Sequence, residues 1–410
     1  MNKQTINKNL SHALKFSTLS LAIACSFNVS ANIGEDVSKA VKDSKVDVSL
    51  RYRVETVDQD GASEDAMAST LKSRLTVTTG KVSNFSAKVE VDDVTAIGND
   101  SYNSTVNGKT DYPVVADPEG SEVNQAYLQY SGDMFTATAG RQRIVLDDQR
   151  FVGGVAWRQN EQTYDGYRLQ VKPVDKLTLD ASYVYNVNRI FGEDSGKSDL
   201  HGDVILLNAK YKFNKQHALT VFNYSLEFDG AAAGTSSNTM GATYNGNFDL
   251  GGTGLAVKAG FANQEDAGDN PTSFEASYMV LEAMAKFDSF SVGGGYEVLG
   301  SDDGNIAFST PLATLHKFQG FADKFLNTPA DGIVDTYVKA ATKVGPVGLS
   351  AAYHIYEADE GNDEYGNEFN IAAGYKFNKQ VSGLLKAASY SSDDYATDTT
   401  KIWFMVTANF

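Results

Sequence analysis

The chain has 410 residues, with 52 acidic against 35 basic residues and a formal net charge of −17 at pH 7. So acidic a chain disfavours nucleic acid as a partner. Beyond the first thirty residues no apolar run reaches 18 residues, which excludes a transmembrane helix and leaves either a soluble fold or a membrane β-barrel.

The N-terminus is typical of a secretory signal peptide. Three lysines precede an apolar stretch over 16–29, and Val29-Ser30-Ala31 provides the small residues that a signal peptidase requires. We predict cleavage after Ala31, so that 1–31 is a signal peptide and 32–410 is a single barrel domain. An alternative interpretation, a lipoprotein site at Cys25, fits less well because the required leucine lies one position too far away.

Cleavage would remove the chain's only cysteine, so the mature chain would have no disulfide and no thiolate metal site. Without the three lysines of the signal peptide, 32 basic residues remain against 52 acidic ones, a formal charge of about −20.

Polar and apolar residues alternate along most of the mature chain. In 48–55 the even positions are apolar, and in 177–183 and 255–261 the odd positions are apolar. A period of two predicts strands with one face in an apolar environment and the other in water. We predict about 18 strands, at 46–57, 70–80, 82–92, 122–132, 134–144, 160–172, 176–189, 202–213, 216–228, 236–247, 253–264, 273–287, 289–299, 333–344, 346–358, 366–377, 380–391 and 400–410.

The links between these strands alternate in length. Short links, such as 80–81, 214–215, 288–289, 345–346 and 378–379, alternate with long ones, such as 93–121, 145–159, 300–332 and 359–365. This asymmetry is typical of an outer-membrane barrel with short periplasmic turns and long extracellular loops. The segment Tyr-Lys-Phe-Asn-Lys-Gln occurs twice, and we interpret it as one hairpin used at 211–216 and at 375–380.

The last segment of the chain, 401–410, alternates up to a terminal Phe410. It resembles the terminal strand that barrel-assembly machinery reads, so this machinery, membrane lipid and lipopolysaccharide are the expected partners. The fold class is therefore all-β, a transmembrane antiparallel β-barrel in the outer membrane of a Gram-negative bacterium. No sequence feature decides the oligomeric state.

Basic residues occupy the polar faces of the early strands. An Arg that faces lipid at mid-membrane costs about 2–4 kcal/mol, so these residues should face the lumen. Basic rings favour anions in a pore, which indicates a conduit for anionic solutes. The other interpretation is that the arginines pair with lumen acids such as Glu55, Glu90 and Asp92 and only stiffen the wall. The candidates from alternation are Arg51, Arg53, Lys72, Arg74, Arg168 and Lys172.

The long link near residue 320 contains three phenylalanines at helical spacing. Leu315, Phe318, Phe321, Ala322 and Phe325 predict a short amphipathic helix within 313–326. An external loop has little reason to expose such a face, so we hypothesise that it enters the barrel as a plug or constriction. The alternative is a loop packed on its neighbours. The candidate residues are His316, Lys317, Phe318, Phe321, Lys324 and Phe325.

Several short motifs resemble those of the alginate export family of outer-membrane proteins. They are Gly-Arg-Gln-Arg at 140–143, Asp-Gln-Arg-Phe-Val-Gly at 148–153, Trp-Arg-Gln-Asn at 157–160, Thr-Tyr-Asp-Gly at 163–166, and the segment 313–326. The resemblance implies an 18-stranded barrel whose arginine-rich constriction passes a polyuronate, and it leans towards a monomer. The arginines that it implicates in selectivity are Arg141, Arg143, Arg150, Arg158 and Arg168.

Together these features predict a porin-like channel for small hydrophilic solutes, preferentially anionic or sugar acids. The alternatives are a dedicated exporter of an anionic polysaccharide such as alginate, a barrel closed by its loops, and an outer-membrane hydrolase. The four histidines beyond the predicted signal peptide, His201, His217, His316 and His354, match no hydrolase motif, so we expect no enzyme. We expect no cofactor and no metal site, because the acids gather in external loops that are normally solvated.

Overall fold

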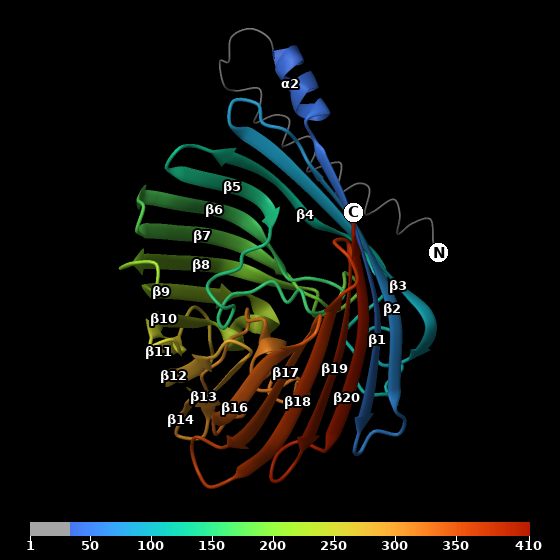
Figure 1. The fold of residues 1–410 in the computed structure, drawn as a ribbon, viewed down its shortest axis with the longest axis vertical. Coiled ribbons are helices and arrows are strands. Elements are labelled where there is room, and N and C mark those ends of the chain that lie inside the picture. The colour runs from blue at the N-terminus through green and yellow to red at the C-terminus, as the bar shows by residue number, and fades with distance from the viewer. Residues whose placement is uncertain (1–32) are drawn as a thin grey trace.

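The computed structural model describes residues 33–410, and the predicted signal peptide with Cys25 lies outside the described residues. Eighteen antiparallel strands form one closed barrel (Figure 1). Its strands are β1 (Lys45–Gln59), β2 (Ala66–Thr78), β3 (Phe85–Ser101), β4 (Gly120–Ser131), β5 (Phe135–Gln142), β6 (Thr163–Val174), β7 (Leu177–Asn188), β8 (Asp199–Lys212), β9 (His217–Phe228), β10 (Ser237–Asp249), β11 (Gly254–Asp266), β12 (Glu275–Lys286), β13 (Phe290–Leu299), β16 (Ile333–Val344), β17 (Val347–Glu357), β18 (Glu364–Lys376), β19 (Val381–Ser391) and β20 (Thr399–Asn409).

Smaller elements lie outside this sheet. A helix, α2 (Ile33–Lys42), precedes β1, and a two-stranded hairpin of β14 (Ser301–Asp302) and β15 (Ile306–Ala307) follows β13. Short 3-10 turns occupy Gly230–Thr235 and Leu315–Lys317. Within residues 33–410, no helix combines the length and the apolar character that a membrane crossing requires.

Each predicted strand corresponds to one strand of the barrel, which confirms the fold class. The largest error is β3, which runs from Phe85 to Ser101 although the prediction ended at residue 92. Its extra length pairs with β2 across a register shift, where Ala68 and Thr70 lie opposite Asp100 and Ala96. The alternation becomes irregular in this half of β3, so the pattern did not reveal it.

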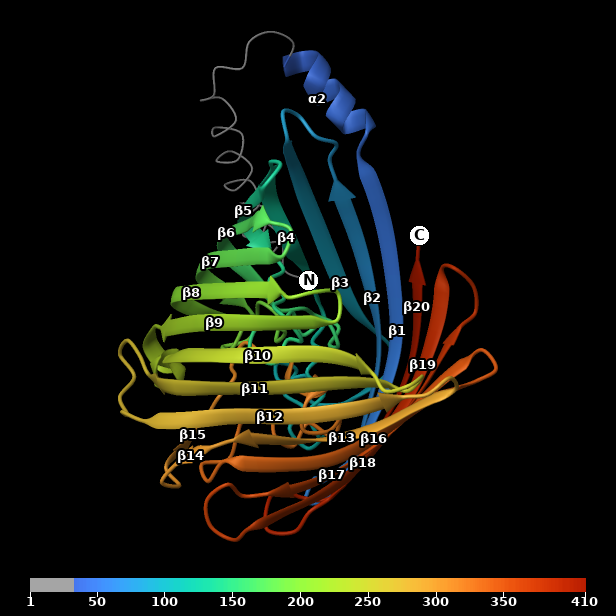
Figure 2. The ribbon, with the colours of Figure 1, turned by 60° about the vertical axis from the view of Figure 1, so that its left-hand side comes forward.

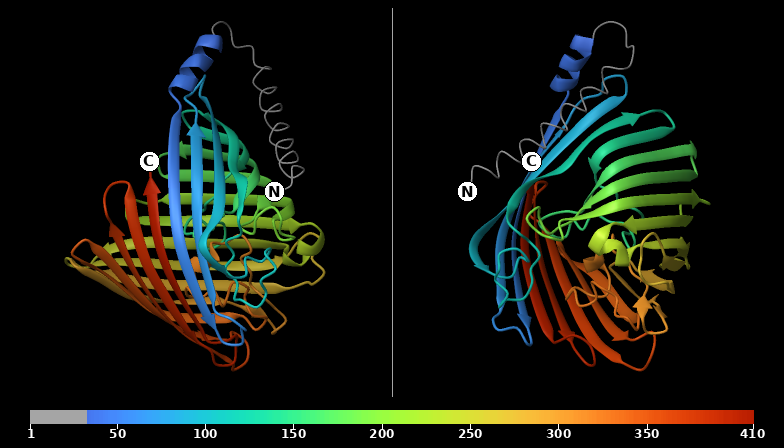
Figure 3. Two further views of the ribbon diagram at one scale, coloured as in Figure 1. Left: turned by 90° about the vertical axis from the view of Figure 1, so that its right-hand side faces the viewer. Right: turned by 180° about the vertical axis from the view of Figure 1, so that it is seen from behind.

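The barrel closes by pairing its first and last strands. Leu50 lies opposite Ala408, and Val54 lies opposite Phe404, in the β1–β20 ladder. In Figure 3 the two strands run side by side, blue beside red. Both ends of the barrel-forming chain, Lys45 and Asn409, therefore lie at the same end of the barrel, as an even number of strands requires.

The two ends of the barrel differ, as predicted. One has short connections, such as 213–216 and 377–380, and we call it the short-turn end; the other is the long-loop end. The two Tyr-Lys-Phe-Asn-Lys-Gln hairpins share one geometry. In each, the Asn side chain (Asn214 or Asn378) accepts hydrogen bonds at 2.8–2.9 Å from the amides two and three residues later. This confirms the prediction that the two segments form the same kind of hairpin.

The outer surface of the barrel is apolar, because outward positions along the strands carry residues such as Phe261, Leu281, Leu385 and Phe404. The lysines and arginines within the barrel strands take inward positions instead, except Arg141, which lies opposite Ala126 and Asp165 near the long-loop end. This division follows from the cost of placing a cation in hydrocarbon.

Two long connections fold into the barrel rather than away from it (Figures 1 and 3). We call residues 143–162, between β5 and β6, the first inner loop, and residues 308–332, between β13 and β16, the second inner loop. Backbone hydrogen bonds join them: the Gly153 amide donates to the Leu312 carbonyl at 2.8 Å, and the Thr314 amide donates to the Gln149 carbonyl at 3.1 Å. The two loops therefore form one body inside the lumen.

The predicted amphipathic helix in 313–326 is wrong. Only Leu315–Lys317 is helical, as one 3-10 turn. Gln319, Gly320 and Asp323 have positive φ angles of 47°, 78° and 61°, which a right-handed helix does not allow. The amides that a helix would use internally bond to the barrel wall instead, as described below.

Candidate functional site

Apart from Arg141, the predicted pore-lining residues lie inside the barrel, where most of them meet acids. On the wall formed by β2 and β3, the Arg74 guanidinium contacts Asp92 at 2.5 Å and Glu161 of the first inner loop at 2.8 Å. Arg143 also bonds Glu161, and it bonds Glu90 on β3. Burial opposes ionisation of Glu161, but the two guanidinium groups outweigh it and lower the pKa of Glu161 to about 2.

A second group of charges joins β1 to both inner loops. Glu55 accepts from Arg53 at 2.5 Å and from Arg158 at 3.0 Å. Arg158 also contacts Asp323 of the second inner loop at 3.1 Å. The Arg53 guanidinium lies 4.6 Å from the centre of the Trp157 ring. This side of the lumen is therefore filled by paired charges.

The side chain of Arg150 links the two inner loops to strand β13. Its side chain is buried and donates to Glu297 on β13 at 2.8 Å, to Thr310 at 3.1 Å and to Gln319 at 3.3 Å. The Phe318 ring covers it, with the guanidinium carbon 4.8 Å from the ring centre. Arg150 is thus an internal cross-link between the two inner loops and β13.

The remaining pore-lining candidates also have identifiable partners or positions. Arg141 pairs with Asp165 at 2.8 Å and Arg168 with Asp180 at 2.6 Å, while Lys72 lies 3.7 Å from Glu161. Arg51 donates to the Gln159 side chain and to backbone carbonyls, and Lys172 is exposed on β6 near the short-turn end. Seven of the eight candidate arginines thus contact a carboxylate, as the pairing interpretation expects. Their role in selectivity stays a prediction.

The candidates of the second inner loop have separate partners. Lys317 and Phe318 contact Asp148 and Arg150 of the first inner loop, and the others contact the wall. Phe321 lies over the ammonium of Lys386 on β19, 3.1 Å from the ring centre, and Phe325 packs on Tyr356 at 4.6 Å. Lys324 donates to Thr399 on β20 at 2.7 Å, and burial lowers the pKa of Lys324 to about 8. The spacing that suggested one helical face instead reflects separate contacts to different neighbours.

The candidate His316 lies at the centre of this contact. Its Nδ1 lies 2.6 Å from Asp323, and its Nε2 lies 2.6 Å from the Nζ of Lys386. Its ring stacks on Trp157 at 4.3 Å, and burial lowers the pKa of the imidazole to about 3. Sequence reasoning missed Lys386, although a lysine at an inward position of the otherwise apolar run 384–388 was a usable signal.

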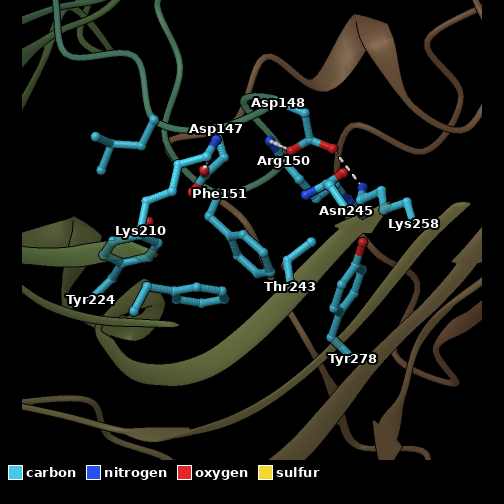
Figure 4. Close-up of a pocket in the computed structure, with 12 residues that line it drawn as sticks. Asp147, Asp148, Arg150, Phe151, Lys210, Tyr224, Thr243, Asn245, Lys258 and Tyr278 are labelled. Carbon is cyan, nitrogen blue, oxygen red and sulfur yellow. Dashed lines mark hydrogen bonds and ion pairs between the residues drawn. The ribbon is translucent and has the colours of Figure 1, made fainter. Parts of the chain in front are cut away.

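Beneath the first inner loop lies a cavity of about 240 Å³ (Figure 4). Its lining combines aromatic rings with paired charges: Lys258 contacts Asp148 at 2.5 Å, and Lys210 lies 3.6 Å from Asp147. In Figure 4 the Phe151 ring points into the space between these pairs. The wall residues come from β8 to β12, which the sequence analysis had not connected with a site.

Basic side chains dominate the lumen wall at the short-turn end. Over the last five residues of every barrel strand at that end, inward positions carry ten basic side chains and four acidic ones. Seven of the ten have no carboxylate within ion-pair distance among the described residues. These seven are Lys45, Lys88, Lys172, Lys212, Lys286, Lys343 and Lys376. Of them, the sequence analysis named only Lys172.

Within residues 33–410, the side-chain hydrogen bonds of His217, His316 and His354 go to residues other than serine. Both ring nitrogens of His316 are occupied, and His354 contacts Asp335 at 2.9 Å through Nδ1. Over residues 33–410, no group of three or more His, Cys, Asp or Glu side chains is placed to hold a metal ion.

Residues 43–283 match the family described as alginate export, which is more than half of the chain. The chain belongs to the alginate export family. This confirms the resemblance inferred from the Arg-rich motifs, and it makes the protein an outer-membrane β-barrel.

Solved structures share the architecture of this alginate export family member. Acinetobacter baumannii OccAB4 has a TM-score of 0.72 at 14% identity, covering 90% of this chain and 98% of its own. Pseudomonas aeruginosa OccK9 (OpdG) has a TM-score of 0.71 at 15% identity, over 90% of this chain and 99% of its own. The structure of Pseudomonas aeruginosa OpdK with vanillate has a TM-score of 0.72 at 14% identity, with the same coverage of 90% and 99%. Such similarity shows a shared channel fold. Among curated proteins, none matches the chain.

Proposed function

We propose that this protein is an outer-membrane channel that passes small hydrophilic solutes, with a preference for anionic solutes and sugar acids. The proposal includes delivery to the membrane after loss of residues 1–31 and an orientation with the short-turn end in the periplasm. The observation that carries it is the excess of unpaired lysines on the lumen wall at the short-turn end. Basic rings in a pore favour anions.

The arginines of the early strands support this proposal less than the lysines do. A guanidinium already paired with a buried carboxylate contributes little net charge to a passing solute. The ammonium groups of Lys212, Lys286, Lys343 and Lys376 lie at inward positions without such partners. We therefore assign the anion preference mainly to the lysines and the mechanical role mainly to the arginines.

The cavity beneath the first inner loop favours a hydroxylated solute. Carbohydrates present hydroxyls to charged and amide side chains and C–H faces to aromatic rings, and this cavity offers both kinds of surface. Pseudomonas aeruginosa OpdK, which shares the fold, was solved with vanillate, a carboxylate. The cavity supports a hydroxylated solute, and the likeness to OpdK supports an organic anion.

Planar bilayers with a salt gradient test the proposal. We expect the reversal potential to indicate anion selectivity and to move towards zero in Lys212→Gln/Lys376→Gln. Lys197→Gln, the same change in a loop at the long-loop end, is the matched control and should leave the reversal potential unchanged. Cation selectivity of the parent protein would overturn the proposal.

Family membership favours a second candidate, a dedicated exporter of an anionic polysaccharide. A polymer needs a continuous path, and the two inner loops lie across the lumen in this structure. Export would thus require the loops to move. Oligouronates of increasing length, tested as blockers of an open channel, separate the two functions, because only an exporter should admit the long ones.

A further inference from the structure

The second inner loop is closed at its base by hydrogen bonds. The Thr328 hydroxyl donates to the Phe308 carbonyl at 2.8 Å, and the Phe308 amide donates to the Gly300 carbonyl at 2.8 Å. Gly332, the last residue of the loop, has a φ angle of +73°. The segment between Phe308 and Thr328 is therefore a loop whose two ends are held together.

Its two halves are held differently. Residues 308–314 bond to the first inner loop through backbone groups, as the Gly153–Leu312 and Thr314–Gln149 pairs show. Residues 315–327 contact the barrel wall on β17 to β20, and they meet the first inner loop through side chains only, as in the Gln319–Arg150 and Asp323–Arg158 contacts. The second half can therefore leave the wall without breaking the backbone pairs between the loops, although it has to give up these side-chain contacts.

We propose that residues 315–327 are a gate in the lumen, and that Glu368 on β18 and Lys386 on β19 are the positioning residues that hold it closed. The proposal rests on the channel function proposed above and adds how its path is opened.

Glu368 holds the backbone of the gate. One oxygen of its buried carboxylate accepts hydrogen bonds from the amides of Phe321 at 2.5 Å and Ala322 at 2.9 Å. The turn is possible because residue 320 is glycine: its φ is +78°, and a Cβ there would lie 2.4 Å from the Glu368 carboxyl. The gate thus lies directly on this carboxylate, with no space for a side chain between them.

Lys386 holds the side chains of the gate. Its ammonium lies 3.1 Å from the centre of the Phe321 ring and 4.2 Å from that of Trp157, and it lies 2.6 Å from the Nε2 of His316. Trp403 on β20 forms the third side at 5.3 Å. Within the described residues no carboxylate lies at ion-pair distance from Lys386, so its ammonium is held by rings and by one imidazole nitrogen.

The contact between gate and wall leaves polar atoms without partners. These buried atoms are the second carboxylate oxygen of Glu368, the Tyr356 hydroxyl, the Asn370 amide nitrogen and the indole nitrogens of Trp157 and Trp403. A buried polar atom without a hydrogen bond is less stable than the same atom in water. Opening the gate to water would give these atoms partners, which offsets part of the contacts that the gate loses.

Cysteine labelling tests the gate directly. Ala322 is 1% exposed in the closed position, and Cys25, the chain's only cysteine, is replaced by Ser. We expect a membrane-impermeant thiol reagent to label Ala322→Cys about tenfold faster when Glu368→Ala or Lys386→Met is added, because the gate then spends more time open. The conservative changes Glu368→Gln and Lys386→Arg keep an acceptor and a cation, and should restore slow labelling.

Matched controls are available on the same barrel. Glu357→Ala changes an exposed, outward-facing Glu on β17, and Lys197→Met changes an exposed loop lysine; neither touches the gate, and neither should alter labelling. Heat-resistant migration on gels shows which variants are folded. Should one of the two gate variants fail to fold, the other tests the same contact from the neighbouring strand.

Single-channel recording separates the gate from the channel function. We expect Lys386→Met to lengthen open times about twofold or more with unchanged anion selectivity. Anion-selective currents with unchanged labelling and unchanged open times in the gate variants would overturn the gate. Faster labelling without conductance in any variant would support the gate and overturn the channel function.

Discussion

Loss of Arg150 should destabilise the inner loops strongly. This residue is 1% exposed and contacts Glu297, itself 3% exposed, at 2.8 Å. Arg150→Met keeps the length of the side chain but leaves the carboxylate of Glu297 buried without a cation, which typically costs about 3–5 kcal/mol. Two donors to Glu297 remain, the Tyr278 hydroxyl at 2.6 Å and the Gln319 amide. We therefore expect the free energy of unfolding to fall by about 3 kcal/mol, at the lower end of this range.

The measurement is urea unfolding in lipid vesicles, followed by tryptophan emission. The chain has two tryptophans, Trp157 and Trp403, and their rings lie 5.8 Å apart where the inner loops meet the wall. Their emission therefore reports on this contact rather than on the whole barrel. Arg189→Met, a change in a loop at the long-loop end, is the control and should cost no more than about 0.5 kcal/mol.

A double variant distinguishes lost pairing from lost packing. Glu297→Gln removes the charge that Arg150→Met leaves alone, so the double variant should recover at least half of the lost free energy. The reasoning is refuted if the double variant is as unstable as Arg150→Met, or if Arg150→Met behaves like the Arg189 control.

Three further outcomes follow from single positions. Gly320→Ala places a Cβ at φ +78°, 2.4 Å from the Glu368 carboxyl, and should reduce the free energy of unfolding seen by tryptophan emission by about 1–3 kcal/mol; no change would contradict the tight turn. The pKa of Glu161 is depressed from 4.5 to about 2, so its contribution is complete above pH 4.5 and is lost as the pH falls through 2. Glu161→Gln should therefore be less stable than the parent at pH 7 and approach it at pH 2, and a constant difference would show that the charge is not responsible. Leu281→Arg, outward at the middle of β12, should cost about 2–4 kcal/mol in vesicle unfolding, whereas no cost would mean that this face does not meet lipid.

The positions of the strands were predictable from the sequence because every strand faces lipid on one side and the lumen on the other. Residues such as Leu281 face lipid and residues such as Glu282 face the lumen, so the period of two persists from one turn to the next. It weakens in the second half of β3, which passes beyond the regular ladder at a register shift. Helix α2 was missed because ten residues carry little local signal. Its end is held by a tertiary contact, in which the Gly80 amide donates to the Ala40 carbonyl at 2.9 Å.

The interior was less predictable, because its contacts join distant parts of the chain. Arg150 and Glu297 are 147 residues apart, and only the closed barrel brings them together. Alternation placed the early cations in the lumen, but it does not reveal which of them meet an acid. The error over 313–326 has a similar source. Phe318, Phe321 and Phe325 have helical spacing, but their rings contact separate neighbours: Arg150 of the first inner loop, Lys386 on β19 and Tyr356 on β17.

The β1–β20 seam joins the first barrel strand to the last, over the whole length of β20. Every other neighbouring pair of barrel strands is also consecutive along the chain and is available as soon as both members are made. The edge of β1 therefore has no partner until residues 399–409 exist, and unpaired backbone groups are costly in hydrocarbon. A nascent barrel of this chain cannot wait in the membrane for its last strand without something else covering that edge, so insertion and closure have to be coupled in time.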